Sequence, residues 1–257
     1  MNFGRMATIS ANVFRETIRD RVLYLVGFYA LLMGIAIRIL PEVAASTETK
    51  MIADFGIATM SILGLMVTAF VGAGLINKEI EKQTLLILLA KPISKGEFIL
   101  GKHLGLSAAI SVLVALMTVV YALSLQISQI PYSLASLLVA VFYLLLELFL
   151  LSAVALTLGV FTSSLLATLI SLAVYLMGHF SQDLVALGQL AENKDIEWLT
   201  QTIYLVLPDL SRLDLKNQAV YGLLPDVPTL LVNAGYGLLY TALLLILAIS
   251  IFSKRQF

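Results

Sequence analysis

Long runs of apolar side chains dominate this sequence, and they restrict the fold more than any other feature. A helix needs about 20 mainly apolar residues to cross a bilayer core of about 30 Å. Of the 257 residues, 60 % are hydrophobic and only 12 % are charged, whereas soluble domains carry about 25 % charged residues. The chain is therefore expected to be an integral membrane protein, and the soluble, disordered, collagen-like and coiled-coil classes are excluded.

Six stretches are long and apolar enough to cross a membrane. They lack the alternation of a transmembrane β-barrel, and in lipid only helices or closed barrels satisfy the backbone. We therefore predict an all-α polytopic membrane protein with one transmembrane domain over residues 1–257. The predicted spans are 22–40, 54–76, 102–125, 134–158, 165–187 and 230–252.

Lysine and arginine are concentrated in the segments on one side of these spans. The basic segments are the N-terminus, the loop between spans two and three, and the C-terminus. The positive-inside rule places such segments in the cytoplasm. An even number of spans also puts both termini on the same side, so we expect a multi-pass protein of the inner (plasma) membrane with both termini cytoplasmic. The formal net charge of zero gives no reason to expect nucleic-acid binding.

The N-terminal segment 1–21 is predicted to form an amphipathic helix. Arg15 and Arg19 belong to a basic and polar stripe on the opposite face from the apolar side chains. Such a helix is expected to lie in the interface plane, with its basic face toward anionic headgroups or a protein partner. Both interpretations stay open: a membrane-surface anchor, or an elbow helix that docks a cytoplasmic subunit. The apolar half consists of Phe3, Met6, Ile9, Val13, Phe14 and Ile18.

The cytoplasmic loop 77–101 combines charged and apolar residues. Glu79 and Glu81 lie among lysines, and the apolar segment LLILLA follows them. A loop that only connects two spans has little use for such a segment in water. The pattern favours a short helix that inserts into a groove on another protein.

Proline and a capping sequence divide this loop into two helical pieces. Pro92 is expected to end the first piece, because proline cannot continue the hydrogen-bond ladder. Ser94 and Glu97 form an S-x-x-E capping box that begins the helix of span three. Gly101 and Gly105 form a G-x-x-x-G pattern, which indicates either a close helix contact or a chance occurrence.

Few charged residues or histidines lie inside the predicted spans. Glu147, in the middle of span four, is either a contact for substrate or ions or a structurally paired carboxyl. His179 and Asp183 are four residues apart on span five, which favours a hydrogen bond between them, and two ligands without a third make a poor metal site. His103 is expected to face the cytoplasmic interface. With no cysteine and no catalytic triad or paired-carboxylate pattern, neither a metal site nor catalysis is predicted.

The segment 188–229 connects the last two spans on the extracytoplasmic side. About forty residues are too few for an independent enzyme domain. Part of it, EWLTQTIYLVLP, is apolar enough to lie on the outer interface or dip into it. We expect a small cap or a re-entrant hairpin.

Three parts of the sequence resemble the ABC-2-type permeases of ATP-binding-cassette transporters, in particular the short six-span members. The N-terminal helix ends in FRETIRDR. The loop NKEIEKQTLLILLAKPISKGEFILGK is similar to the family pattern of a glutamate, a threonine followed by leucines, a proline-containing turn, an acidic residue and a Gly-Lys pair. The segment LPDLSRLDLKNQAVYG, residues 207–222, is similar to a stretch that many of these permeases carry before the last span.

The resemblance implies a permease subunit of an ABC transporter, most simply an exporter. Two permease chains, identical or homologous, would form the translocation path in the lipid bilayer. Separate ATPase subunits would bind ATP and magnesium, so the chain itself would be no enzyme and hold no cofactor. The segment from Glu79 to Ala90 would be the coupling helix and residues 3–20 the elbow helix. The implied coupling residues are Glu79, Glu81, Thr84, Leu85, Leu86 and Pro92.

Two other functions remain open. An ion-coupled secondary transporter would use Glu147, although such proteins have internal repeats or spans broken near the midplane. A non-transporting scaffold would anchor a partner at the membrane through the same loop.

Overall fold

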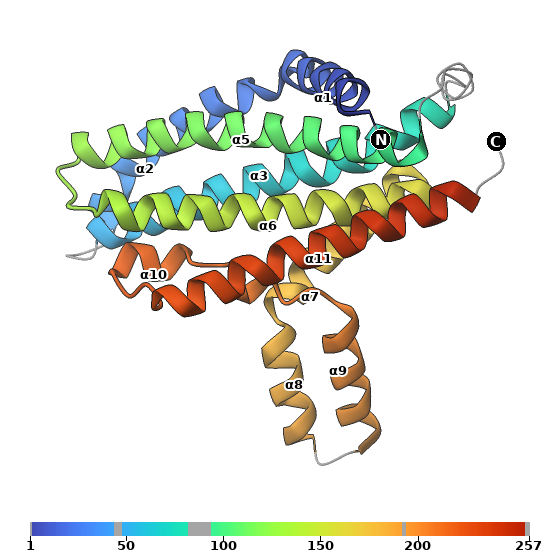
Figure 1. Cartoon of the computed structure of the whole chain (residues 1–257). Helices are drawn as coiled ribbons and strands as arrows, with labels where there is room; N and C mark the ends of the chain where they lie inside the picture. The colour runs from blue at the N-terminus through green and yellow to red at the C-terminus, as the bar shows by residue number, and fades with distance from the viewer. Residues whose placement is uncertain (1, 44–47, 82–93, 192–193, 255–257) are drawn as a thin grey trace.

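The computed structural model describes residues 2–43, 48–81, 94–191 and 194–254, and within these ranges the regular elements are all helices (Figure 1). The N-terminal half contains α1 (Phe3–Thr17), a π-helical turn η1 (Ile18–Val22), α2 (Tyr24–Val43), α3 (Glu48–Glu81) and α5 (Lys95–Ile127). The C-terminal half contains α6 (Leu134–Phe161), α7 (Ser164–His179), α8 (Ser181–Leu190), α9 (Lys194–Val206), the 3₁₀ turn η2 (Leu210–Arg212), α10 (Lys216–Tyr221) and α11 (Val227–Lys254).

Five of these helices are each long and apolar enough to cross a membrane: α2, α3, α5, α6 and α11. The predicted fifth span, 165–187, is not one straight helix. It consists of α7 and α8, which meet at an angle of 67° and would make a sixth span only if counted as a bent pair. The 16 residues of α7 are fewer than the about 20 that a straight span needs.

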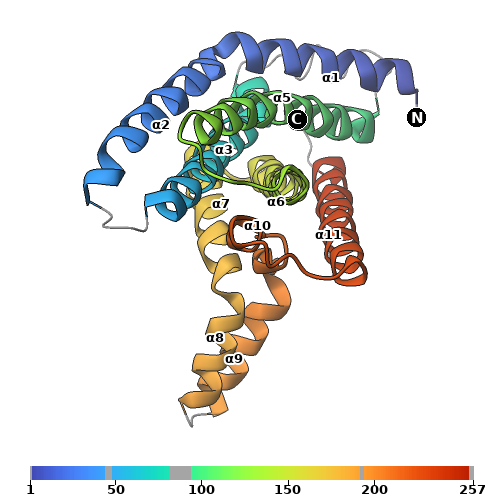
Figure 2. The ribbon, with the colours of Figure 1, turned by 90° about the vertical axis from the view of Figure 1, so that its left-hand side faces the viewer.

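Helix α6 forms the centre of the bundle, with α3, α5, α7 and α11 arranged around it (Figure 2). Every residue from 150 to 157 is buried, so this part of the helix is covered on all sides. A helix that is apolar all round its circumference is typical of such a position. The core therefore surrounds the second half of α6, where a polar group has protein rather than lipid as its neighbour.

The two ends of the described chain lie at the same end of the bundle (Figure 1). The backbone N–H of Asn2 donates to Oε1 of Glu97, near the start of α5. The ammonium of Lys95 donates to the carbonyl oxygens of Phe252 (3.4 Å) and Ser253 (3.0 Å), at the end of α11. The first turn of α5 thus holds both terminal helices.

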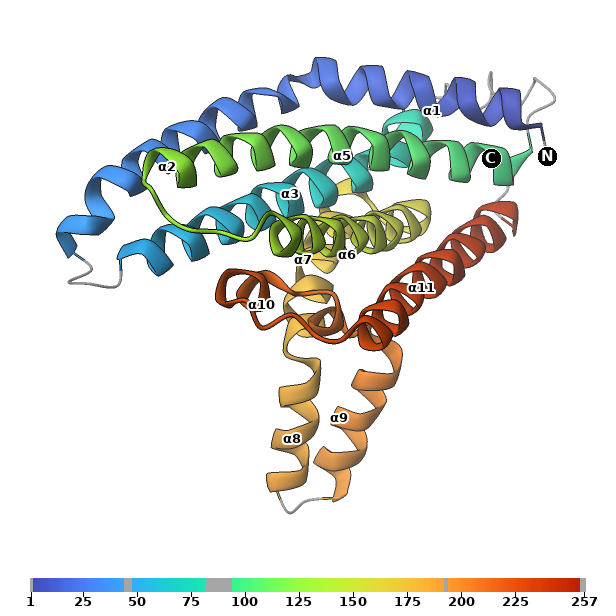
Figure 3. The same ribbon diagram turned by 60° about the vertical axis from the view of Figure 1, so that its left-hand side comes forward.

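Helix α1 lies lengthwise against the first half of α5 (Figure 3) and does not cross the ends of the spans. The orientation in the interface plane stays a prediction, and the structure adds that this helix packs along α5. The amphipathic pattern itself is confirmed, because Val13 is buried and Arg15 and Arg19 are exposed.

The G-x-x-x-G pattern forms the contact between these two helices. A Cβ atom placed on Gly101 would lie 2.9 Å from Cβ of Ile9, and one on Gly105 would lie 2.5 Å from the carbonyl oxygen of Ser10. Real Cβ atoms do not approach other atoms this closely, so only glycine lets the two helices come together at these positions. The sequence had left a close contact and a chance occurrence open; the structure shows a close contact.

The loop between the second and third spans is shorter than predicted at both ends. Helix α3 continues to Glu81, and α5 already begins at Lys95, where the predicted capping box is present: Ser94 Oγ accepts from the Glu97 backbone N–H (3.1 Å), and the Glu97 carboxylate accepts from the Ser94 N–H (3.1 Å). The predicted coupling residues Thr84, Leu85, Leu86 and Pro92 lie outside the described residues.

The segment 188–229 divides into two parts with different surroundings. The hairpin of α8 and α9 projects away from the bundle (Figures 1–3). Its helices pack closely, since a Cβ on Gly188 would lie 2.0 Å from Oγ1 of Thr200. Residues 207–216 then return to the bundle, where Asp209, Leu210 and Leu213 are buried. We call residues 207–216 the returning segment. The segment 188–229 therefore consists of a projecting hairpin and a part that packs on the bundle, and it is not a single cap.

Candidate functional site

Glu147 lies at the middle of α6, and its side chain is completely buried. Neither of its carboxylate oxygens has a hydrogen-bond partner among the described residues. A carboxylate in such a position is unfavourable unless another charge compensates it. The groups around Glu147 therefore decide what this position can do.

His179, the last residue of α7, lies between two carboxylates. Its Nε2 atom is 3.5 Å from Oε1 of Glu147 and 3.5 Å from Oδ2 of Asp214. Its other ring nitrogen, Nδ1, lies 3.0 Å from the carbonyl oxygen of Tyr175. A donated hydrogen bond to this carbonyl orients the ring and directs Nε2 at the carboxylates. The bend after His179 places this side chain at the end of a helix, next to the returning segment.

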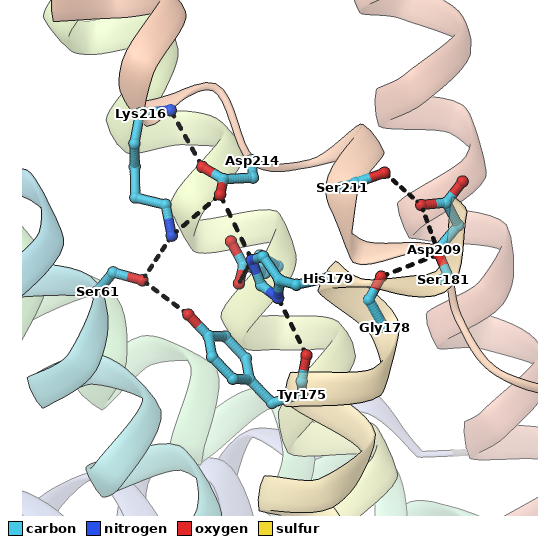
Figure 4. Close-up of polar contacts among 10 residues, drawn as sticks. Ser61, Tyr175, Gly178, His179, Ser181, Asp209, Ser211, Asp214 and Lys216 are labelled. Atoms are coloured by element: carbon cyan, nitrogen blue, oxygen red, sulfur yellow. Dashed lines mark hydrogen bonds and ion pairs between the residues drawn. The ribbon is translucent and has the colours of Figure 1, made fainter. Parts of the chain in front are cut away.

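Asp214 and Lys216 bring a second pair of charges to the site from the segment before α10 (Figure 4). Their side chains form an ion pair of 3.3 Å. Burial disfavours the charged form of Asp214, but the neighbouring His179 ring and the charge of Lys216 outweigh it and hold the pKa of this carboxyl below its usual range. Burial also disfavours the charged form of Lys216, but Glu147 and Asp214 outweigh it and raise the pKa of this ammonium.

Two hydroxyl groups connect these charges to α3 and back to α7. The ammonium of Lys216 donates to Oγ of Ser61 (3.1 Å), and this oxygen lies 3.4 Å from the hydroxyl of Tyr175 (Figure 4). The network therefore joins α3, α6, α7 and the segment leading into α10. Its four ionisable residues are Glu147, His179, Asp214 and Lys216, which we call the buried charge network.

Asp209 holds the returning segment in place. Its carboxylate accepts from Ser181 Oγ at the start of α8 (3.2 Å) and from Arg212 Nε (3.0 Å), and its backbone N–H donates to the hydroxyl of Tyr236 on α11 (2.8 Å). Gly178 allows close approach, since a Cβ there would lie 2.7 Å from the carbonyl oxygen of Pro208. These contacts fix the position from which Asp214 and Lys216 reach the interior.

The buried charge network can resist movement of the returning segment. Opposite charges that are separated in a low-dielectric interior lose several kcal/mol of attraction, whereas the same charges in water lose little. Sliding the segment away from α6 would remove Asp214 and Lys216 from the network and leave Glu147 with His179 alone. The arrangement therefore favours one packing of α10 and α7 against α6 over others.

The structure brings together some of the predicted residues and separates others. Glu147 and His179 are in contact, but Asp183 is exposed on α8 and the predicted bond between it and His179 is wrong, because the helix bends between them. The prediction for His103 is also wrong: it is buried, and its Nδ1 lies 3.0 Å from Oγ of Ser152 on α6. This hydrogen bond explains how a polar ring is accommodated inside the bundle.

Of the predicted coupling residues, Glu79 is described with its side chain and Glu81 only by its place in α3. Glu79 forms an ion pair with Lys102, whose side chain is buried on α5. This ion pair holds the Glu79 carboxylate against α5.

Sequence reasoning missed Asp214, Lys216, Ser61 and Tyr175. The signals for Asp214 and Lys216 were the resemblance of residues 207–222 to a family stretch and the charged pattern of DLSRLDLK between apolar flanks. Ser61 and Tyr175 gave no signal, since single hydroxyl groups are common in membrane helices.

Comparison with known proteins gives one finding. A family model described as ABC-2 family transporter protein matches residues 7–257, almost the whole chain. A search of individually curated proteins finds none that matches.

Proposed function

Because the chain belongs to the ABC-2 family of transporter proteins, we propose that it is the permease subunit of an ABC exporter in the inner (plasma) membrane, with both termini in the cytoplasm. Two such chains, identical or homologous, would enclose the translocation path. Separate ATPase subunits, which bind ATP and magnesium, would supply the energy. Binding of ATP can drive the change only if it favours one arrangement of the bundle over the other.

The observation that carries this proposal is that polar contacts attach α1, α3 and α11 to the beginning of α5. Lys95 holds the end of α11, Glu97 holds the N-terminus of α1, and Lys102 holds Glu79 of α3. A force applied to the segment just before α5 would therefore reach three other helices through direct polar contacts. This is the position in the chain at which the coupling segment Glu79 to Ala90 would meet an ATPase.

The first test is recovery of the ATPase with the chain. An affinity-tagged chain is expected to co-purify with a Walker-motif protein from its own cells. Replacing Leu85 and Leu86 by serine should reduce the recovered ATPase about tenfold or more, because the coupling segment would lose its apolar contact. The measurement is quantitative mass spectrometry of the purified complex.

The matched control replaces two leucines on the projecting hairpin, Leu187 and Leu190, which are exposed. This pair should leave recovery of the ATPase unchanged. The proposal fails if no ATPase is recovered with the unmodified chain, or if a cysteine introduced at Lys95 reacts only with a reagent added from outside the cell.

An ion-coupled transporter is the second candidate, and the contact between Glu147 and His179 favours it. Our proposal predicts that transport by the unmodified chain stops when ATP is depleted and continues when an ionophore dissipates the ion gradients. Glu147→Gln should lower the rate without changing this dependence on ATP. Transport measured in vesicles with and without an ATP-regenerating system tests the prediction, and transport that follows the ion gradient would replace our proposal with the second candidate.

A further inference from the structure

Two cavities adjoin at the end of the bundle opposite the termini. One has a volume of about 310 Å³ and the other about 300 Å³, and Ile57 and Val220 line both. Small-molecule sites typically have volumes of about 300–1,000 Å³ and a largely apolar lining with a few convergent polar groups. Together the two cavities are large enough for a small organic molecule.

The first cavity is apolar and partly aromatic. Side chains from α3, α5, α6 and α10 line it, and its polar lining groups include a tyrosine whose hydroxyl is already engaged: Tyr121 donates to the carbonyl oxygen of Ala53 (2.9 Å). Leu125, Ile130 and Leu137 contribute aliphatic surface. This half suits the hydrocarbon or aromatic body of a ligand.

The second cavity has several polar side chains in its lining and touches the buried charge network. Asp54, Ser61, Tyr175, Lys216 and Asn217 line it. Lys216 is already matched by Asp214 and Ser61, at 3.3 Å and 3.1 Å. This ammonium is therefore a poor partner for an additional anion.

Asp54 contributes a carboxylate to the lining of this cavity. Lys216 forms its ion pair with Asp214 and not with Asp54. Its Oδ2 accepts from the hydroxyl of Tyr221 (2.9 Å), whereas its buried Oδ1 has no hydrogen-bond partner among the described residues. Lys50, one turn earlier on α3, is exposed, and its ammonium lies 5.4 Å from the centre of the Tyr221 ring. Glu147 and Asp214 add negative charge behind Lys216, and His179 lies between them. A buried acceptor without a partner favours a ligand that brings a positive charge or a donor.

We propose that the two cavities form one binding site for a cationic amphiphile, an organic cation whose charged group lies against Asp54 and whose apolar body lies against Leu125 and Leu137. This inference rests on the proposed function and names the class of substrate that the permease would carry. The aromatic rings of Tyr121 and Tyr132 in the lining are also suited to a cation, because the face of an aromatic ring attracts positive charge.

Two ions of the same shape and opposite charge test this proposal. Radiolabelled tetraphenylphosphonium and tetraphenylborate would be measured by equilibrium dialysis against the purified full chain, together with its ATPase if that co-purifies. The phosphonium should bind saturably and the borate should not. Asp54→Asn should weaken phosphonium binding about tenfold or more, since it removes the charge but retains an oxygen for Tyr221. Ala219→Phe, which fills the apolar half, should also weaken it.

Asp226→Asn is the matched control, because it removes an exposed carboxylate outside the lining of both cavities. It should leave the affinity within about twofold, and thermal unfolding of each variant shows whether the chain remains folded. Equal binding of the borate, an unchanged affinity in Asp54→Asn, or no saturable phosphonium binding would each overturn the site. Because these measurements need no ATP, they are independent of ATPase recovery, and failure of the binding site can be told apart from failure of the proposed function.

Discussion

Replacing Lys216 by methionine is expected to destabilise the protein by about 3 kcal/mol. The substitution removes the cation that pairs with Asp214 and leaves Asp214 and Glu147 with only His179 to compensate them. Removing one partner of a buried ion pair typically costs about 3–5 kcal/mol. We expect the lower end of this range because the Lys216 side chain retains 17 % exposure. The loss would be measured as a shift in the midpoint of thermal or denaturant unfolding in detergent.

A second substitution separates the charge effect from a loss of packing. The double variant Lys216→Met with Asp214→Asn removes both charges and should recover part of the lost stability, because Glu147 is then the one carboxylate left beside His179. Lys194→Met, on the exposed part of the projecting hairpin, should have little effect. If the single and double variants unfold at the same midpoint, the ion pair does not stabilise this packing.

Gly105→Ala is expected to detach α1 from α5. The new methyl group would lie 2.5 Å from the carbonyl oxygen of Ser10 and 2.7 Å from Cβ of Val13. The first of these atoms belongs to the backbone and cannot rotate away, so the whole helix must move. Overpacking of this kind typically costs about 1–3 kcal/mol. Limited proteolysis should cut the N-terminal helix earlier, and transport should fall, since α1 would no longer follow movements of α5.

Gly27 in α2 provides the matched control. A Cβ at this position has no atom within 4 Å, so Gly27→Ala adds the same methyl group without a clash. Removing a glycine from the interior of a helix should stabilise the chain by about 0.5–1 kcal/mol. If both variants unfold alike, the glycine contact does not hold α1 on α5.

Much of the fold was predictable because it depends on local sequence. Apolar length identified α2, α3, α5, α6 and α11 as membrane-crossing helices. The pattern of Ser94 and Glu97 identified the start of α5, and the wheel pattern identified the buried and exposed faces of α1. Each of these depends on residues within a few turns of one another.

The site was predictable only in part. Glu147 was recognisable because a charge inside an apolar span stands out in the sequence. Its partners come from residues 32 or more positions away, and no local pattern links them. His179 was assigned to Asp183 because a straight helix would have placed them together, and the bend between α7 and α8 removed that neighbour.

The sequence by itself determined that this chain crosses a membrane with several helices, where most of them lie, and which family it resembles. Hydrophobic transfer and local capping decide these properties, and both can be read from neighbouring residues. Only the tertiary structure decided that α1 lies along α5, that the predicted fifth span bends, and that Asp214 and Lys216 return to join Glu147 and His179 in one network. These outcomes depend on which surfaces fit closely and which charges compensate one another across the bundle, and such energies arise only when distant segments are packed together.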